Sequence, residues 1–140
     1  MSPANIHATA VALDPERGAL ILGRSGAGKS ELALRLMAFG ARLVADDRVD
    51  LEARNGSLWS CAPAPLSGLI EMRGVGILRA DPIPEARIML VVDLDLEETE
   101  RLPPLRTRDL LGISLPLVLR LQRGHLDVAV LQWLKGGRAA

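Results

Sequence analysis

The chain has 140 residues, 49% of them hydrophobic, which predicts a single folded domain with its own core. Positive and negative side chains balance at 17 each and only 2% of residues are aromatic, which argues against a nucleic-acid-binding protein. No apolar run approaches the ~18 residues that span a membrane, and the N-terminal residues lack the basic and apolar regions of a secretory signal. The lone Cys61 cannot form an internal disulfide and is interpreted as a packing residue, so we expect a cytoplasmic protein.

The first third of the chain predicts two strands followed by a helix. Residues 8–13 form the first expected strand, and a turn over residues 14–18 leads into a short buried strand over residues 19–22. Residues 31–39 are strong helix formers, with apolar side chains at i, i+4 and i+7, and Gly40 suits the end of that helix.

The remainder of the chain is predicted to be rich in strand. Apolar or alternating runs indicate strands at residues 42–45, 49–53, 58–61, 88–92, 115–121 and 126–131. Asn55-Gly56 predicts a hairpin between the second and third of these strands. Residues 67–72 fit a helix or a strand, and residues 97–112 are polar and contain proline. The expected class is therefore α/β, strand-rich with few helices.

The most specific motif lies between the strand at residues 19–22 and the helix. It matches the phosphate-binding pattern G-x-x-x-x-G-K-[ST] at every required position, through Gly23, Arg24, Ser25, Gly26, Ala27, Gly28, Lys29 and Ser30. Glycines let the backbone N–H groups form a concave nest for phosphate oxygens. Lys29 adds positive charge, and Ser30 offers a hydroxyl for Mg²⁺. Because a strand precedes the loop and a helix follows it, the motif predicts nucleotide or phosphate binding rather than an ordinary glycine-rich turn.

A second candidate group, Asp46-Asp47, directly follows the strand at residues 42–45. Adjacent side chains in extended chain face different directions, so one carboxylate could hold Mg²⁺ while the other takes a proton from an attacking hydroxyl. A solvated turn is the alternative interpretation, since aspartate is common in turns. The neighbouring phosphate-binding motif favours a role in the site.

These motifs together resemble the HPr kinase/phosphorylase family. Its pattern is a P-loop and a helix followed by R-L-V-A-D-D-R-V, which is the sequence of residues 42–49. Residues 71–77 are similar to its E-[IV]-R-G-x-G-I signature, and Ile6-His7 resembles its V-H-G segment. The resemblance covers roughly residues 6–121. It implies a P-loop kinase domain of the HPr kinase and phosphoenolpyruvate carboxykinase-like type, here over residues 1–135, with a disordered tail over residues 136–140.

The resemblance also implies an activity. Such enzymes phosphorylate a serine of the small phosphocarrier protein HPr with ATP or pyrophosphate, regulating a sugar or nitrogen phosphotransferase system. They also remove that phosphate by phosphorolysis, and they often assemble as hexamers. We therefore expect Mg²⁺ as cofactor, an HPr-like partner and a homo-oligomer, without nucleic-acid or membrane partners.

Residue roles follow from the matching positions. Lys29, with the amides of the loop glycines, would bind the transferred phosphate, and Ser30 with Glu71 would ligate Mg²⁺. Asp46 would be the general base toward the substrate serine, and Asp47 would support the metal. His7 would lie beside the two aspartates and tune them. Arg101 is matched to the arginine of a later D-R-L-G motif and would clamp phosphate or substrate.

Three features depart from the family pattern. The given sequence corresponds to the catalytic domain without the N-terminal domain that members commonly carry. Residues 79–84, after the E-x-R-G signature, are short and proline-rich where the family captures its protein substrate. The D-R-L-G motif appears only as E-R-L-P at residues 100–103, and the downstream G-R-N motif is not recognisable at residues 123–125. Two alternatives therefore stay open: a P-loop kinase of a small metabolite, and a nucleotide-dependent sensor without turnover.

Overall fold

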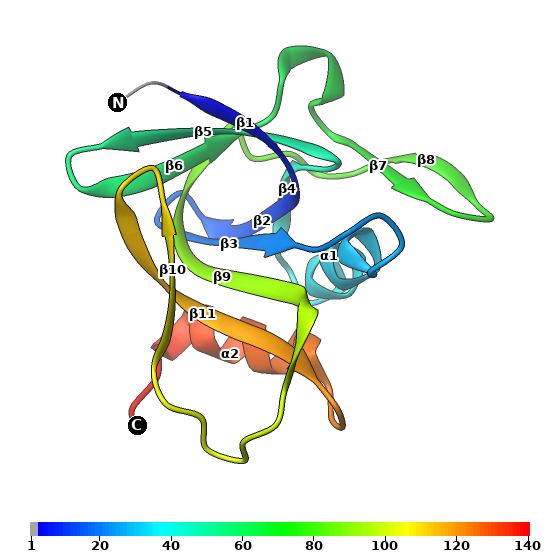
Figure 1. Cartoon of the computed structure of the whole chain (residues 1–140). Helices are drawn as coiled ribbons and strands as arrows, with labels where there is room; N and C mark the ends of the chain where they lie inside the picture. Colours follow the sequence, from blue (N-terminus) through cyan, green and yellow to red (C-terminus); the bar gives the residue numbers. More distant parts are fainter. Residues whose placement is uncertain (1–2) are drawn as a thin grey trace.

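The computed structural model describes residues 3–140, and about half of this part of the chain is β-strand (Figure 1). Met1 and Ser2 lie outside the described residues. They belong to the N-terminal segment in which no secretory signal pattern is found. The elements of residues 3–140 are, in order, β1 (Ala4–His7), β2 (Thr9–Asp14), β3 (Arg17–Leu22), α1 (Lys29–Ala38), β4 (Arg42–Ala45), β5 (Arg48–Arg54), β6 (Ser57–Cys61), the 3-10 helix η1 (Ala64–Leu66), β7 (Leu69–Met72), β8 (Gly76–Arg79), β9 (Glu85–Glu98), β10 (Arg106–Leu110), β11 (Ile113–Leu121) and α2 (Leu126–Gly136).

The long strand β9 organises the sheets. Its first residues pair antiparallel with β6, which continues the order β1-β5-β6. Its middle pairs in parallel with β3, which continues through β2 to β4, and its later part pairs in parallel with β11, which pairs with β10. The strands β7 and β8 form a separate hairpin that projects from the body (Figure 1).

Two hydrophobic cores lie on opposite faces of the β4-β2-β3-β9 sheet. Val11, Ile21 and Val92 face α1 and α2, which contribute Leu36 and Leu134 to the first core. The neighbouring positions Ala10, Leu20 and Val91 face the other way and pack against β5 and β6. The sheet therefore lies between a helical layer and a β layer.

A bulge explains how β9 serves both cores. The register between β3 and β9 shifts from Gly18↔Ile88 to Ala19↔Leu90, so Ile88 and Leu90 join opposite cores. Gly18 is needed at this crossing because a Cβ there would lie 2.8 Å from the carbonyl oxygen of Arg87. Such close backbone approach is a frequent reason for glycine within a strand.

The sheet brings several chain segments to one edge. Strands β3 and β9 run parallel, and β4 runs in the same direction because β2 is antiparallel to both β3 and β4. The C-terminal ends of β3, β4 and β9 therefore meet at the edge where β2 begins. In open α/β sheets this is the edge that binds ligands.

The expected α/β, strand-rich architecture is confirmed, and several elements follow the predicted pattern. Strands β2 to β6 lie at or within a few residues of the predicted segments. Asn55 and Gly56 connect β5 and β6 with φ of 49° and 78°, the left-handed conformations that a tight hairpin turn requires. The open alternative at residues 67–72 resolves as the strand β7.

The predicted strand at residues 126–131 is wrong, because the segment forms the first part of α2. Buried Val130, Leu131 and Leu134 follow the helical period, which continues three residues beyond the apolar run. A short apolar run fits a strand and a buried helix equally well, and the packing against α1 decides between them. Gly136, predicted to start a frayed tail, is the last residue of this helix.

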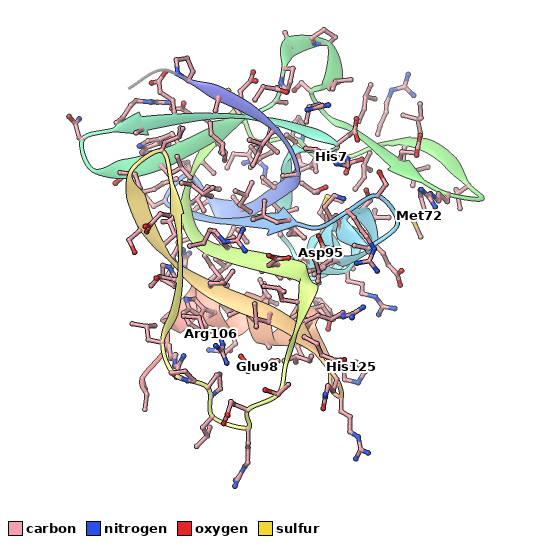
Figure 2. The ribbon with its side chains drawn as sticks, viewed as in Figure 1. His7, Met72, Asp95, Glu98, Arg106 and His125 are labelled. Atoms are coloured by element: carbon pink, nitrogen blue, oxygen red, sulfur yellow. The ribbon has the colours of Figure 1, made fainter. Side chains whose placement is uncertain are left out.

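The polar segment at residues 97–112 also contains a strand, β10. Its Arg106 donates two hydrogen bonds of 2.8 Å, from Nε and Nη2, to the two carboxylate oxygens of Glu98 at the end of β9. This contact closes the loop at the lower end of the molecule in Figures 1 and 2. The hydrogen bonds from Arg106 lower the pKa of Glu98 from 4.5 to about 2.

The Glu98 contact predicts a pH-dependent contribution to stability. A carboxyl group whose pKa is lowered by folding stabilises the fold above its unfolded pKa of 4.5, and the contribution is lost as the pH falls towards 2. We expect Glu98→Gln to lower the free energy of unfolding at neutral pH and the deficit to shrink through this range. Urea unfolding of both proteins across the range measures it, with Glu31→Gln on the exposed face of α1 as control. A deficit that stays constant with pH would contradict the assignment.

Candidate active site

The phosphate-binding loop (residues 23–30) connects the end of β3 to the start of α1, at the ligand edge of the sheet (Figure 1). Gly26 and Gly28 have φ of 84° and 103°, and Gly28 occupies the cap position before the helix. Gly23 is held closely, since a Cβ there would lie 3.0 Å from the Cβ of Ala27. The motif thus adopts a conformation that places backbone N–H groups at a helix N-terminus, the arrangement that binds phosphate.

Lys29 is buried at the floor of this loop. Its Nζ donates hydrogen bonds to the carbonyl oxygens of Gly23 at 2.6 Å and Arg24 at 3.0 Å. An ammonium group has three donors, so one remains for a ligand. The loop carbonyls therefore fix the position of the charge before any phosphate binds.

Asp46 is a buried acceptor shared by three segments. Its Oδ1 accepts hydrogen bonds from Thr9 Oγ at 3.0 Å and Ser30 Oγ at 2.7 Å, and its Oδ2 accepts one from the backbone N–H of Glu71 at 3.1 Å. Its residue exposure is 5%. Sequence patterns marked Asp46 as the base, but an acidic side chain so enclosed and so fully bonded is poorly placed to take a proton from a substrate.

Asp47 has the opposite environment. Its φ of 69° lies in the left-handed region, and its side chain is 68% exposed. Asp47 Oδ1 lies 3.1 Å from Nε2 of His7, at the end of β1 (Figure 2 labels His7). The prediction that the two aspartates point apart and that His7 lies beside them agrees with this geometry, and the more accessible of the two carboxylates is that of Asp47.

The β7–β8 hairpin forms the other wall. Glu71 lies on β7, and Arg73 follows in the turn, with its Nη1 3.8 Å from the position that a Cβ on Gly26 would occupy. Arg73 therefore lies over the phosphate-binding loop. Sequence patterns assigned no role to Arg73, although it stands in the E-x-R-G signature.

These groups line one cleft of about 440 Å³. Its polar side is formed by the phosphate-binding loop, His7, Asp46, Asp47 and Glu71. Its apolar side is formed by the side chains of Leu66, Leu69, Met72 and Ile77. A cleft that joins apolar walls to a few convergent charged groups is typical of a small-molecule or cofactor site.

Arg101 is not brought into this cleft. It lies in the connection between β9 and β10, which Figure 1 shows at the lower end of the molecule, away from α1 and the phosphate-binding loop. The match to the D-R-L-G motif therefore gives Arg101 no contact with the cleft within this chain. Cys61 also lies outside it, on β6, where partial burial and the charge of Asp50 raise the pKa of its thiol, in keeping with a packing residue.

The donor groups fit Mg²⁺. Among residues 3–140 no group of three or more His, Cys, Asp or Glu side chains is placed to hold a metal ion by itself. Mg²⁺ is usually held by one or two protein oxygens, waters and substrate phosphates. Ser30 donates its hydroxyl hydrogen to Asp46, which leaves its oxygen lone pairs available, and the Glu71 carboxylate lines the same cleft.

Comparison with known proteins identifies the family. Residues 2–115 match the model of the HPr serine kinase C-terminal domain. The chain belongs to this family. The structure is similar to that of the Hpr(Ser) kinase/phosphatase from Coxiella burnetii, with a TM-score of 0.76, 28% sequence identity and 94% coverage of each chain.

Curated relatives named HPr kinase/phosphorylase give the same family. The protein from Geobacillus thermodenitrificans is 42% identical over 92 residues, which are 60% of this chain and 30% of that protein. The protein from Acidovorax sp. is 42% identical over 130 residues, which are 81% of this chain and 40% of that protein. The chain thus spans less than half the length of these relatives. Within residues 3–140, no helix is long and apolar enough to cross a membrane.

Thr9 is a site residue that sequence patterns missed, and its contact with Asp46 yields a prediction. Thr9→Val keeps the side-chain shape but removes the hydroxyl donor, so we expect the free energy of unfolding to fall by about 2 kcal/mol, as for a hydrogen bond to a charged group. The affinity for Mg²⁺-nucleotide should also fall, because the Asp46 carboxylate that orients the Ser30 hydroxyl loses its hydrogen bond from Thr9. Denaturant unfolding and titration calorimetry measure the two effects.

The matched control for Thr9→Val is Ser60→Ala. Ser60, on β6, is as buried as Thr9, and its Oγ donates a hydrogen bond of 2.9 Å to the carbonyl oxygen of Ala86. Ser60 does not line the cleft. It should lose about 1 kcal/mol of stability, as for a neutral hydrogen bond, with unchanged nucleotide affinity. Equal nucleotide affinity in both variants would show that Thr9 does not support the site.

Proposed function

We propose that this chain transfers the γ-phosphoryl group of ATP to a serine hydroxyl of an HPr-like phosphocarrier protein. Pyrophosphate would be an alternative donor, and phosphorolysis by inorganic phosphate the reverse activity. The observation that carries the proposal is that the accessible Asp47–His7 pair and the phosphate-binding loop with Lys29 line the same cleft. A proton acceptor beside a phosphate site is what transfer to a hydroxyl group requires. The family membership and the names of its relatives supply the serine and the carrier.

The transfer step assigns each group a role. The serine oxygen attacks the γ-phosphorus, the bond to the β–γ bridging oxygen breaks, and ADP leaves. Asp47 takes the serine proton, and His7 holds Asp47 toward the cleft through the 3.1 Å contact. In phosphorolysis, inorganic phosphate attacks the phosphorus of the phosphoserine, the bond to the serine oxygen breaks, Asp47 returns a proton to that oxygen, and pyrophosphate is formed. Phosphoryl transfer depends mainly on position and charge, so these placements supply most of what the chemistry needs.

The remaining groups stabilise phosphate charge. Lys29 and the N–H groups of Gly26 and Gly28 would bind the transferred phosphate, and Arg73, which lies close to Gly26 in the same cleft, would stabilise the charge that spreads over the equatorial oxygens. Ser30 and Glu71 would hold Mg²⁺, with Asp46 fixing Ser30 from behind. When bound, Mg²⁺ neutralises charge on the donor phosphates.

The protein as proposed works in the cytoplasm on a protein partner and assembles as a homo-oligomer, with a hexamer as the expected form from the family resemblance. Neither nucleic acid nor a membrane is required as a partner. The assembly is measured directly by sedimentation velocity.

Transfer of label from γ-labelled Mg-ATP to a purified HPr-like phosphocarrier tests the function. We expect label on a serine of the carrier, and loss of that label in Lys29→Ala, because Lys29 provides the buried positive charge of the phosphate-binding loop. Nucleotide binding without label on the carrier would contradict the proposal. Label on a small hydroxyl compound would then indicate a metabolite kinase, and absence of any transfer would indicate a sensor.

The assignment of the base is tested by Asp47→Asn. We expect transfer to fall about 100- to 10,000-fold, the usual range for loss of a general base, while Mg-ATP affinity is retained. Asp46→Asn should instead weaken Mg-ATP binding, because its carboxylate supports Ser30. Asp50→Asn is the matched control. Asp50 accepts a hydrogen bond from Asn5 of β1, just as Asp47 contacts His7 of the same strand. Unlike Asp47, Asp50 does not line the cleft. Full activity in Asp47→Asn would return the role of base to Asp46.

A further inference from the structure

A carboxylate outside the cleft accepts hydrogen bonds from the start of the phosphate-binding loop. Asp95, near the end of β9, accepts hydrogen bonds from the backbone N–H of Arg24 at 3.1 Å and 3.0 Å, one to each carboxylate oxygen. It accepts a third from Arg24 Nη1 at 3.0 Å. Figure 2 labels Asp95 next to the loop, on the side away from His7. Two of the three contacts are therefore made to backbone and do not depend on the arginine side chain.

The bonded N–H belongs to the peptide group that also holds Lys29. The peptide bond between Gly23 and Arg24 carries the N–H that Asp95 accepts and the carbonyl oxygen that accepts from Lys29 Nζ at 2.6 Å. A trans peptide is planar, and its N–H and C=O point in opposite directions. Rotation of this peptide away from Asp95 would therefore also turn its carbonyl away from Lys29.

Asp95 is itself held by a partly buried ion pair between Asp93 and Arg108. Its backbone N–H donates to Oδ1 of Asp93 at 2.9 Å, and Oδ2 of Asp93 accepts from Arg108 Nη2 at 2.5 Å. Asp93 is 7% exposed, so the Arg108 guanidinium on β10 compensates a charge that burial alone would disfavour. A continuous series of contacts thus runs from β10 through the end of β9 to the phosphate-binding loop.

We propose that Asp95 is a positioning residue for phosphate binding, which sets the place of the Lys29 ammonium through the Gly23–Arg24 peptide group. Asp93 and Arg108 keep Asp95 in place. None of these three residues lines the cleft, so each acts through another group rather than on the ligand. The inference rests on the proposed function only in taking a phosphate donor as the ligand of the loop.

Amide hydrogen exchange of residues 23–29 in the ligand-free protein tests the effect on the loop. Asp95→Ala should accelerate exchange of these amides about tenfold, the scale of a lost hydrogen bond to a charged acceptor. Calorimetric affinity for Mg-ATP and for pyrophosphate should fall by a similar factor. Asp95→Asn, which keeps one oxygen acceptor, should lie between the wild type and Asp95→Ala and serves if the alanine variant does not fold.

Asp14→Ala is the matched control. Asp14 likewise accepts from a backbone N–H, that of Glu16 at 2.9 Å, and from an arginine, Arg17 Nε at 2.7 Å, but at the opposite end of β3. It should leave both the exchange of the loop and the donor affinity unchanged. Arg24→Ala should weaken donor binding less than Asp95→Ala does, because it keeps the backbone contacts.

The outcomes separate this inference from the proposed function. Loop exchange and donor affinity that match those of Asp14→Ala would overturn the role of Asp95. An effect of Arg24→Ala as large as that of Asp95→Ala would also overturn it, since the side-chain ion pair would then account for the contact. If the loop and donor effects are found while no phosphocarrier is labelled, the role of Asp95 stands and the proposed function fails.

Discussion

The site depends on one buried carboxylate. Asp46 accepts hydrogen bonds from the start of β2, the start of α1 and β7, through Thr9, Ser30 and the N–H of Glu71. A buried charge is tolerated only when its oxygens are bonded, so these three segments must meet for the fold to close at this edge. The same contacts orient the Ser30 hydroxyl and bring the Glu71 hairpin over the phosphate-binding loop. Formation of the site is therefore coupled to formation of the fold.

A single backbone conformation places two identical side chains, those of Asp46 and Asp47, in different environments. The left-handed φ of Asp47 turns the chain sharply after β4, so Asp46 points into the protein while Asp47 points toward the cleft and His7. This conformation is unfavourable for most residues but tolerated by aspartate. The contact from the N–H of Ala8 to the carbonyl oxygen of Asp47 helps to hold the turn against β1 and β2. Environment rather than residue type thus distinguishes the accessible carboxylate, Asp47, from the buried one, Asp46.

The phosphate-binding loop is supported from two sides by residues that sequence patterns did not select. Thr9 acts on one end of the loop through Asp46 and Ser30, and Asp95 acts on the other through the Gly23–Arg24 peptide. Both residues come from strands that meet the loop only because the sheet order places β2 and β9 on either side of β3. Threonine and aspartate are common in strands and loops, so no local signal marks them. Their roles depend on contacts between segments distant in sequence.

The sequence by itself determined the phosphate-binding loop, the paired aspartates, most of the central strands and the family, because each is encoded in a short segment whose residue types have few alternative uses. Only the tertiary structure decided that residues 126–131 are helical, since a short apolar run satisfies both periods and packing against α1 selects one. It also decided which aspartate is accessible and left Arg101 outside the cleft. Burial, backbone conformation and distance across the sheet arise from the whole fold, and no local pattern contains them.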